Sequence, residues 1–234
     1  MKRFMVVLLC SSTICLHAQK TVDVADGNAS AMSPSFFTVV NGEPVVFAKF
    51  AKIVEGTPYF SDEWMKGNVV VNGGDRFAGV YVKLDLYDNE VHYRDLKGIE
   101  LVATTPIQKV ILFDSSAQLV FNFVNGPYIN TNEKLKGWYL LLAEGKASVF
   151  KQINKHMHED KPYGSATIER SVYTSFQYYA LYNGNFVQIK KFKEIPDILA
   201  DKKDEVSKYI KDNNLSGKTD DDYRKIFDFY NGLK

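Results

Sequence analysis

The feature that most constrains this chain is a repeated Asn-Gly dipeptide that separates short runs of β-branched and aromatic residues. The dipeptide occurs at Asn41-Gly42, Asn72-Gly73, Asn125-Gly126 and Asn183-Gly184. Both residue types tolerate the positive φ angles that tight hairpins require. The last dipeptide separates residues 178–182 from residues 186–190, where apolar and polar residues alternate. This spacing predicts an antiparallel β domain.

Ten further segments have the composition of strands. They are residues 36–40, 45–54, 68–71, 76–87, 90–94, 99–103, 107–113, 119–124, 138–143 and 147–153. In residues 80–86 the alternation is especially regular, with Val80, Val82 and Leu84 on one face and Tyr81, Lys83 and Asp85 on the other. We expect this number of strands to exceed what one open sheet can hold. We expect an antiparallel sandwich or a partly closed barrel, because either covers the apolar faces and reduces the exposed edges.

The end of the chain differs from the β region in charge and in apolar period. Residues 190–234 contain 11 basic and 10 acidic side chains, whereas the whole chain is 24 % charged. Pro196 suits the first turn of one helix, and Thr219 with Asp222 forms a capping box for a second. We therefore expect a helical hairpin over residues 192–234 that packs on a β domain formed by residues 35–191.

The start of the chain has the three parts of a signal peptide. Lys2 and Arg3 precede an apolar run of 13 residues, and Ala18 is a small residue at the expected cleavage site. The apolar run is too short and too interrupted for a transmembrane span. Residues 1–18 are thus a predicted signal peptide, and the polar residues 19–34 a flexible leader.

Cleavage after Ala18 changes what the mature chain can do. It removes both cysteines, Cys10 and Cys15, so neither a disulfide nor a thiol nucleophile would remain. It leaves 27 basic and 28 acidic residues, a net charge of −1, which gives no indication of a nucleic-acid partner. We expect a protein in the periplasm, at the outer-membrane periphery or in the extracellular space.

The loop between the two predicted helices resembles the first half of a calcium-binding loop. Asp212, Asn214 and Ser216 supply oxygen at positions 1, 3 and 5, and Gly217 follows at position 6. Position 12 is Tyr223, where a bidentate glutamate is needed. A polar helix end, a glycine turn and a new helix start explain the same residues, so a weak calcium site and a plain turn both remain open.

Motifs for catalysis are weak throughout the chain. His156 and His158 would share one side of an extended segment, but their sequence context favours a solvated charged turn over a metal site. Neither a Gly-x-Ser-x-Gly motif nor a phosphate-binding loop is present. The carboxylates Asp85, Glu90 and Asp95 could serve a glycoside hydrolase, although nothing in their spacing singles them out.

Aromatic residues make up 14 % of the chain, and exported β domains use such residues to stack on sugar rings. Tyr59, Trp64 and Trp138 lie near turns and are the candidate aromatic patch. Packing is the competing explanation, because strands favour aromatic residues.

The spacing Gly56-x-Pro58-Tyr59-x-x-x-x-Trp64-x-x-Gly67, with the final Tyr230-Asn231, resembles a family of small exported β-rich proteins of Gram-negative bacteria. The resemblance implies export, a β-meander and a short helical tail, and it brings no activity or cofactor with it. Together these observations favour a non-catalytic module of the cell envelope or the exterior, binding a glycan or another envelope protein. A carboxylate-based hydrolase of an extracellular polymer is the alternative.

Overall fold

The computed structural model describes residues 21–23, 36–45, 51–130 and 134–233. The predicted signal peptide lies outside these residues, as do residues 19–20 and 24–34 of the predicted leader. Strands make up 47 % and helices 21 % of the described residues, so the predicted mainly β fold is confirmed. Thr21–Asp23 forms strand β1, which pairs in parallel with β5 (Arg76–Leu84), so this piece of the leader belongs to the sheet. Within the described residues no helix has the length and apolarity needed to cross a bilayer.

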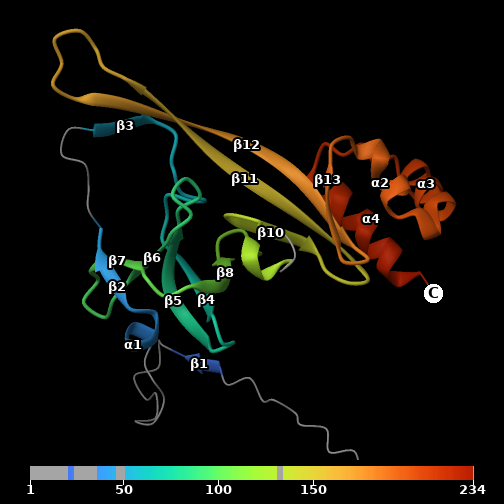
Figure 1. Cartoon of the computed structure of the whole chain (residues 1–234), viewed down its shortest axis with the longest axis horizontal. Coiled ribbons are helices and arrows are strands. Elements are labelled where there is room, and N and C mark those ends of the chain that lie inside the picture. The colour runs from blue at the N-terminus through green and yellow to red at the C-terminus, as the bar shows by residue number, and fades with distance from the viewer. Residues whose placement is uncertain (1–20, 24–35, 46–50, 131–133, 234) are drawn as a thin grey trace, which may run out of the picture.

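Among the described residues, thirteen strands form one continuous sheet (Figure 1). Its order is β13-β12-β11-β10-β9-β8-β4-β5-β6-β7-β2, and neighbours along this path are antiparallel. Besides β1 and β5, the strands are β2 (Gly42–Pro44), β3 (Ala51–Glu55), β4 (Met65–Val71), β6 (Val91–Arg94), β7 (Glu100–Ala103), β8 (Ile107–Asp114), β9 (Leu119–Asn125), β10 (Trp138–Ala143), β11 (Ala147–Asp160), β12 (Ile168–Tyr182) and β13 (Asn185–Ile189).

The expectation that so many strands cannot share one sheet was wrong, although the sheet does not close into a barrel. Large open sheets must curl, and β-bulges provide the bends. Register shifts interrupt β4 against both of its neighbours and β10 against β11. Helices then cover apolar faces that a second sheet would otherwise cover: α4 (Asp220–Gly232) packs on β10 and β11.

Strands β11 and β12 form a ribbon, called the arm below, that is much longer than predicted. They pair continuously from Ala147 opposite Tyr182 to Asp160 opposite Glu169. Figure 1 shows the arm reaching beyond the rest of the sheet, with β3 alongside its far end. The sequence of the far part of the arm shows little apolar alternation, so it does not predict strands. Contacts between side chains on the two strands stabilise it instead, for example the His156 ring stacked on the Tyr173 ring at 4.9 Å. The charged turn predicted at His156 is therefore strand.

Residues 36–40 were predicted to form a strand, but they form a short helix, α1 (Phe36–Val40). Phe36 and Val40, one helical turn apart, are both fully buried. The Phe36 ring lies edge-on to Phe77 at 5.4 Å and to Tyr93 at 5.0 Å. This burial at helical spacing outweighs the strand preference of the sequence Phe-Phe-Thr-Val-Val.

The Asn-Gly turns differ from one another. Asn183 and Gly184 have φ angles of 48° and 76°, as a tight hairpin between β12 and β13 requires. Asn125 instead has a φ of −74° and precedes a short 3₁₀ helix, η1 (Gly126–Tyr128). Of these two dipeptides, only Asn183-Gly184 forms the predicted tight hairpin.

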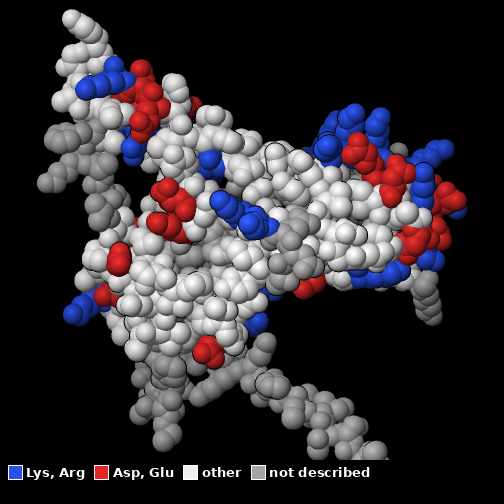
Figure 2. Space-filling model, viewed as in Figure 1, with Lys and Arg blue, Asp and Glu red and all other residues white. Residues whose placement is uncertain are grey.

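The predicted helical tail is confirmed as a helix pair that packs on the sheet. The expected first helix is divided into α2 (Ile195–Ile198), η3 (Ala200–Lys202) and α3 (Lys203–Asp212), because Leu199 leaves the helical conformation with φ −92° and ψ 51°. Thr219 caps α4 as expected. Figure 2 shows side chains of both charges interspersed on this end of the molecule, whereas the face of the sheet in view is largely uncharged.

The C-terminal Tyr-Asn pair fastens α4 to distant parts of the chain. The Asn231 amide donates to the carbonyl of Ala147 and accepts from its amide, both at 2.9 Å. The Tyr230 hydroxyl donates to the carboxylate of Asp201 at 2.9 Å. Asn231 thus supplies backbone-like hydrogen bonds to the first residue of β11.

Replacing Asn231 with alanine is expected to remove both bonds and to lower the free energy of unfolding by about 1–3 kcal/mol. A chain of this size should then melt about 2–4 °C lower for each kcal/mol lost. Differential scanning calorimetry of residues 19–234 measures this. Asn213→Ala is the matched control, since the Asn213 side-chain amide donates to the carbonyl of Tyr209 one turn back in α3. Equal losses in both variants would contradict the proposed fastening.

Candidate functional site

Asp85 organises the turn between β5 and β6. Its side chain is buried, and Oδ1 accepts hydrogen bonds from the amides of Tyr87 at 2.8 Å and Asp88 at 2.9 Å. The backbone of Asp85 also exchanges hydrogen bonds with Glu90. Burial raises the pKa of the Asp85 carboxyl, and the two amides act against it. The turn places Glu90 and His92 beside Asp85 on the same side of the sheet edge.

His92, on β6, is 4 % exposed. Its Nδ1 lies 3.0 Å from Oε1 of Glu100 on β7, and its Nε2 lies 3.5 Å from Oε2 of Glu90. A carboxylate only accepts hydrogen bonds, so a neutral His92 carries its proton on Nδ1. The contact with Glu90 lacks hydrogen-bond geometry, and Nε2 has no hydrogen-bond partner among the described residues. A buried acceptor without a donor is uncommon in proteins.

Asp85, Glu90 and His92 line a pocket of about 650 Å³ between the β2 end of the sheet and the arm, called the seam pocket below. Met157 and Arg170 contribute from the arm. Acidic side chains predominate in the lining: Glu43, Asp85, Asp88 and Glu90. The one basic lining residue among the described ones is Arg170, which forms an ion pair with Glu159 at 2.7 Å. The seam pocket therefore favours a cation.

Tyr59 forms the wall of the seam pocket behind His92. The two rings meet edge-on at 5.4 Å, and Nζ of Lys83 lies 4.6 Å from the centre of the Tyr59 ring. Burial, followed by the charge of Glu100, raises the pKa of the Tyr59 hydroxyl to about 12. Tyr59 is therefore a neutral hydroxyl at physiological pH.

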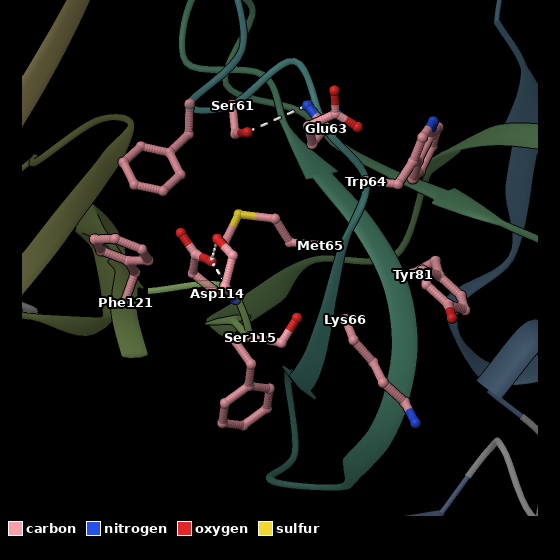
Figure 3. A pocket seen from close by; sticks show the side chains of 12 residues that line it. Ser61, Glu63, Trp64, Met65, Lys66, Tyr81, Asp114, Ser115 and Phe121 are labelled. Atoms are coloured by element: carbon pink, nitrogen blue, oxygen red, sulfur yellow. Dashed lines mark hydrogen bonds between the residues drawn. The ribbon is translucent and has the colours of Figure 1, made fainter. Parts of the chain in front are cut away.

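A second pocket of about 660 Å³, the aromatic groove, surrounds the start of β4. On one side of β4, Met65 and Phe121 point toward the interior, while Lys66 and Tyr81 lie on the other side (Figure 3). Lys66 is opposite Tyr81 on β5 and opposite Phe113 on β8. These three side chains form a row across three adjacent strands.

The row has exposed aromatic rings at both ends. Tyr81 is 52 % and Phe113 38 % exposed, and strand spacing puts them about 10 Å apart. Asp114, the last residue of β8, and Ser115, which follows it, add polar groups to the groove. Asp114 accepts from the hydroxyl and amide of Ser116, and these bonds lower the pKa of its carboxyl. The groove thus combines flat apolar surfaces with a charged and hydroxylated rim.

The predicted aromatic patch is divided in the structure. Tyr59 lines the seam pocket and Trp64 the aromatic groove, with Lys83 contacting both rings. Arg94 also lies over the Trp64 ring, 4.4 Å from its centre. Trp138 is 3 % exposed and donates its indole N–H to the carbonyl of Asn89 at 3.2 Å, so it anchors the core. The structure does not bring the three residues together.

The predicted calcium-loop residues lie between α3 and α4. Asp212 ends α3, and Asn214 adopts a positive φ of 51°. The amides of Ser216, Gly217 and Lys218 donate to Oδ2 of Asp222. Asp222 therefore closes this loop, whereas the capping box predicted that it would accept from the Thr219 amide. Among the described residues no group of three or more His, Cys, Asp or Glu could hold a metal ion. The calcium prediction continues to rest on the loop sequence alone.

Two of the three carboxylates considered for hydrolysis, Asp85 and Glu90, lie together in the seam pocket. Asp95 instead closes the β6–β7 turn by accepting from Lys97 and Ile99. The exposure of Tyr81 was visible in the alternation of β5, because it shares the polar face with Lys83. The pairing of His92 with Glu100 gave no sequence signal, since it depends on the register between β6 and β7.

Comparison of the chain with family models, curated proteins and solved structures finds no match.

Replacing Asp85 with asparagine is expected to raise the melting temperature at pH 7. Asparagine keeps an oxygen that can accept hydrogen bonds from the amides of Tyr87 and Asp88, but its side chain carries no charge to be buried. An acid with a raised pKa in the folded state stabilises the protein below its unfolded pKa, here 3.8, and loses that contribution as pH rises through the folded pKa. The gain should therefore shrink as pH falls toward 3.8.

Melting curves from pH 3.5 to 8 for the native chain and the variant provide the measurement. Asp95→Asn, at the neighbouring turn, is the control and should show no such pH-dependent gain. If Asp85→Asn melted at a lower temperature than the native chain at pH 7, the conclusion that burial raises the pKa of the Asp85 carboxyl would be overturned.

Proposed function

We propose that this protein is an exported, non-catalytic binding module of the cell envelope or the exterior, and that it binds a glycan in the aromatic groove. The observation that carries this proposal is the exposed row Phe113–Lys66–Tyr81 across β8, β4 and β5. Sugar rings have apolar faces and hydroxylated edges. The exposed aromatic rings can stack against the apolar faces of the sugar rings, and the polar rim can form hydrogen bonds with the hydroxyl groups at their edges.

The size and composition of the groove support a saccharide over a lipid chain. A volume of about 660 Å³ is within the range of small-ligand sites. Lys66, Glu63, Ser115 and Asp114 line it together with the rings. A purely apolar ligand would cover these groups without giving them hydrogen bonds, which is costly. A ligand rich in hydroxyl groups satisfies them.

Export of the chain rests on residues 1–18, and membership of the family of small exported β-rich proteins of Gram-negative bacteria rests on the Gly56 to Gly67 spacing and the terminal Tyr230-Asn231. Tyr230 and Asn231 fasten α4, which agrees with a structural role for this part of the pattern.

Hydrolysis of an extracellular polymer is the second candidate function. It is favoured by one observation, namely that Asp85 and Glu90 line the same pocket and the pKa of Asp85 is raised. Raised carboxyl pKa values in a pocket are typical of general acids. Binding remains the better proposal, because one oxygen of Asp85 already holds two backbone amides and so has a structural task.

Tyr81→Ala should weaken glycan binding by about tenfold, because losing one stacked ring costs about 1.5 kcal/mol. The probes are cello-, xylo- and N-acetylchito-oligosaccharides, titrated calorimetrically into residues 19–234. Tyr173→Ala, which removes an exposed tyrosine from the arm, should leave affinity unchanged.

If none of these oligosaccharides binds, or if both variants bind equally, the glycan proposal fails. If shortened oligosaccharides are found in the calorimeter cell after the titration, the hydrolase is favoured instead. In that case Glu90→Gln should abolish their formation, whereas Tyr81→Ala should only raise KM.

Export predicts that the full chain, produced in a Gram-negative host, is recovered outside the cytoplasm with Gln19 as its first residue. Intact mass spectrometry of fractionated cells measures this. Leu9→Arg, which breaks the apolar run, should keep the chain uncleaved in the cytoplasm. A native chain that retains residues 1–18 would contradict the signal-peptide assignment.

A further inference from the structure

We propose that His92 and Glu90 form a binding site for a divalent transition-metal ion of the zinc class at the base of the seam pocket. This site is separate from the aromatic groove and does not depend on the proposed glycan function. Three observations carry it: the hydrogen-bond state of His92, the spacing of two ligand atoms, and the charge of the pocket.

His92 is prepared as a metal ligand. Glu100 accepts from Nδ1 at 3.0 Å, which leaves the lone pair of a neutral ring on Nε2. Metal-binding histidines commonly have this arrangement, because a carboxylate behind the ring fixes its tautomer and raises its basicity. Nε2 is buried, has no hydrogen-bond partner among the described residues, and belongs to a residue that lines the seam pocket.

The separation of Nε2 from Oε2 of Glu90 fits a shared metal ion. At 3.5 Å it is too long for a good hydrogen bond. A zinc ion at about 2.05 Å from the nitrogen and about 2.1 Å from the oxygen would subtend an angle of about 115°, near the tetrahedral value. The Glu90 side chain is 46 % exposed, so it can adjust when the ion enters.

An ammonium group fits the same pair of atoms less well. Hydrogen bonds of about 2.9 Å to both atoms would have to diverge by only about 75°, whereas the N–H bonds of an ammonium diverge by about 109°. The imidazole nitrogen selects against calcium and magnesium, which prefer oxygen ligands. Zinc, nickel, cobalt and copper remain as the matching class of ion.

The surrounding charges favour a cation at this position. Glu43, Asp85 and Asp88 line the same pocket, and the charge of Arg170 is balanced by Glu159. Since the described residues contain no group of three metal-ligating side chains, water would complete the coordination on the pocket side. We therefore expect one exchangeable ion that is bound more weakly than in a structural zinc site, which has four protein ligands.

The test is calorimetric titration of zinc chloride into residues 19–234, with cobalt(II) absorbance as a second readout. The native chain should bind one ion in this site. Glu90→Gln removes the oxygen ligand from a half-exposed position and should lower the affinity by at least tenfold. Glu100→Gln, which removes the positioning carboxylate, should lower it by about 10- to 100-fold.

His156→Ala with His158→Ala is the matched control, because these two histidines lie two residues apart on β11 and could also bind zinc. The double variant should still bind one zinc ion with the affinity of the native chain. Nitrogen-15 NMR of the imidazoles supplies a measurement that needs no mutation, since zinc should shift Nε2 of His92 first. The proposal fails if Glu90→Gln binds zinc with the affinity of the native chain or if the double variant no longer binds it. It also fails if zinc leaves the nitrogen-15 resonance of His92 Nε2 unshifted.

Discussion

The fold depends on the hydrogen bonding of β4 along both of its edges. β4 pairs with β5 on one side and with β8 on the other, and so joins the meander β4–β7 to the meander β8–β13. Gly67 makes this possible, because a Cβ at that position would lie 2.7 Å from the carbonyl oxygen of Ile111 on β8. Any larger residue would force the two strands apart. The last glycine of the Gly56 to Gly67 pattern is therefore explained by close backbone approach.

The path of the chain between the β2 end of the sheet and the arm places the seam pocket. β2 and β3 are consecutive in the chain, yet β2 pairs with β7 while β3 pairs with β12 on the arm. The chain thus links the β2 end of the sheet to the arm without closing a barrel, and the seam pocket occupies the space between them. Two of the three buried polar residues among the described ones, Asp85 and His92, line this pocket.

The two sites have different physical character. The aromatic groove offers exposed rings, where a ligand gains affinity by covering apolar surface. The seam pocket instead holds a buried histidine and a buried aspartate among acidic neighbours, where the gain would come from compensating charge. Buried groups of this kind lower stability unless a partner satisfies them. A ligand bound to Nε2 of His92 would remove this cost.

Local patterns in the sequence determined which segments are strands and helices in much of the chain. The alternation of β5, the Asn183-Gly184 hairpin and the Thr219 cap all follow from neighbours a few residues apart. Only the tertiary structure decided that Phe36–Val40 is a helix, that β4 pairs with β8, that the arm extends to Asp160, and that His92 meets Glu100. Those outcomes depend on burial and strand register between residues distant in sequence. Periodicity reports which face of a segment is apolar, and it carries no information about which segment will cover that face.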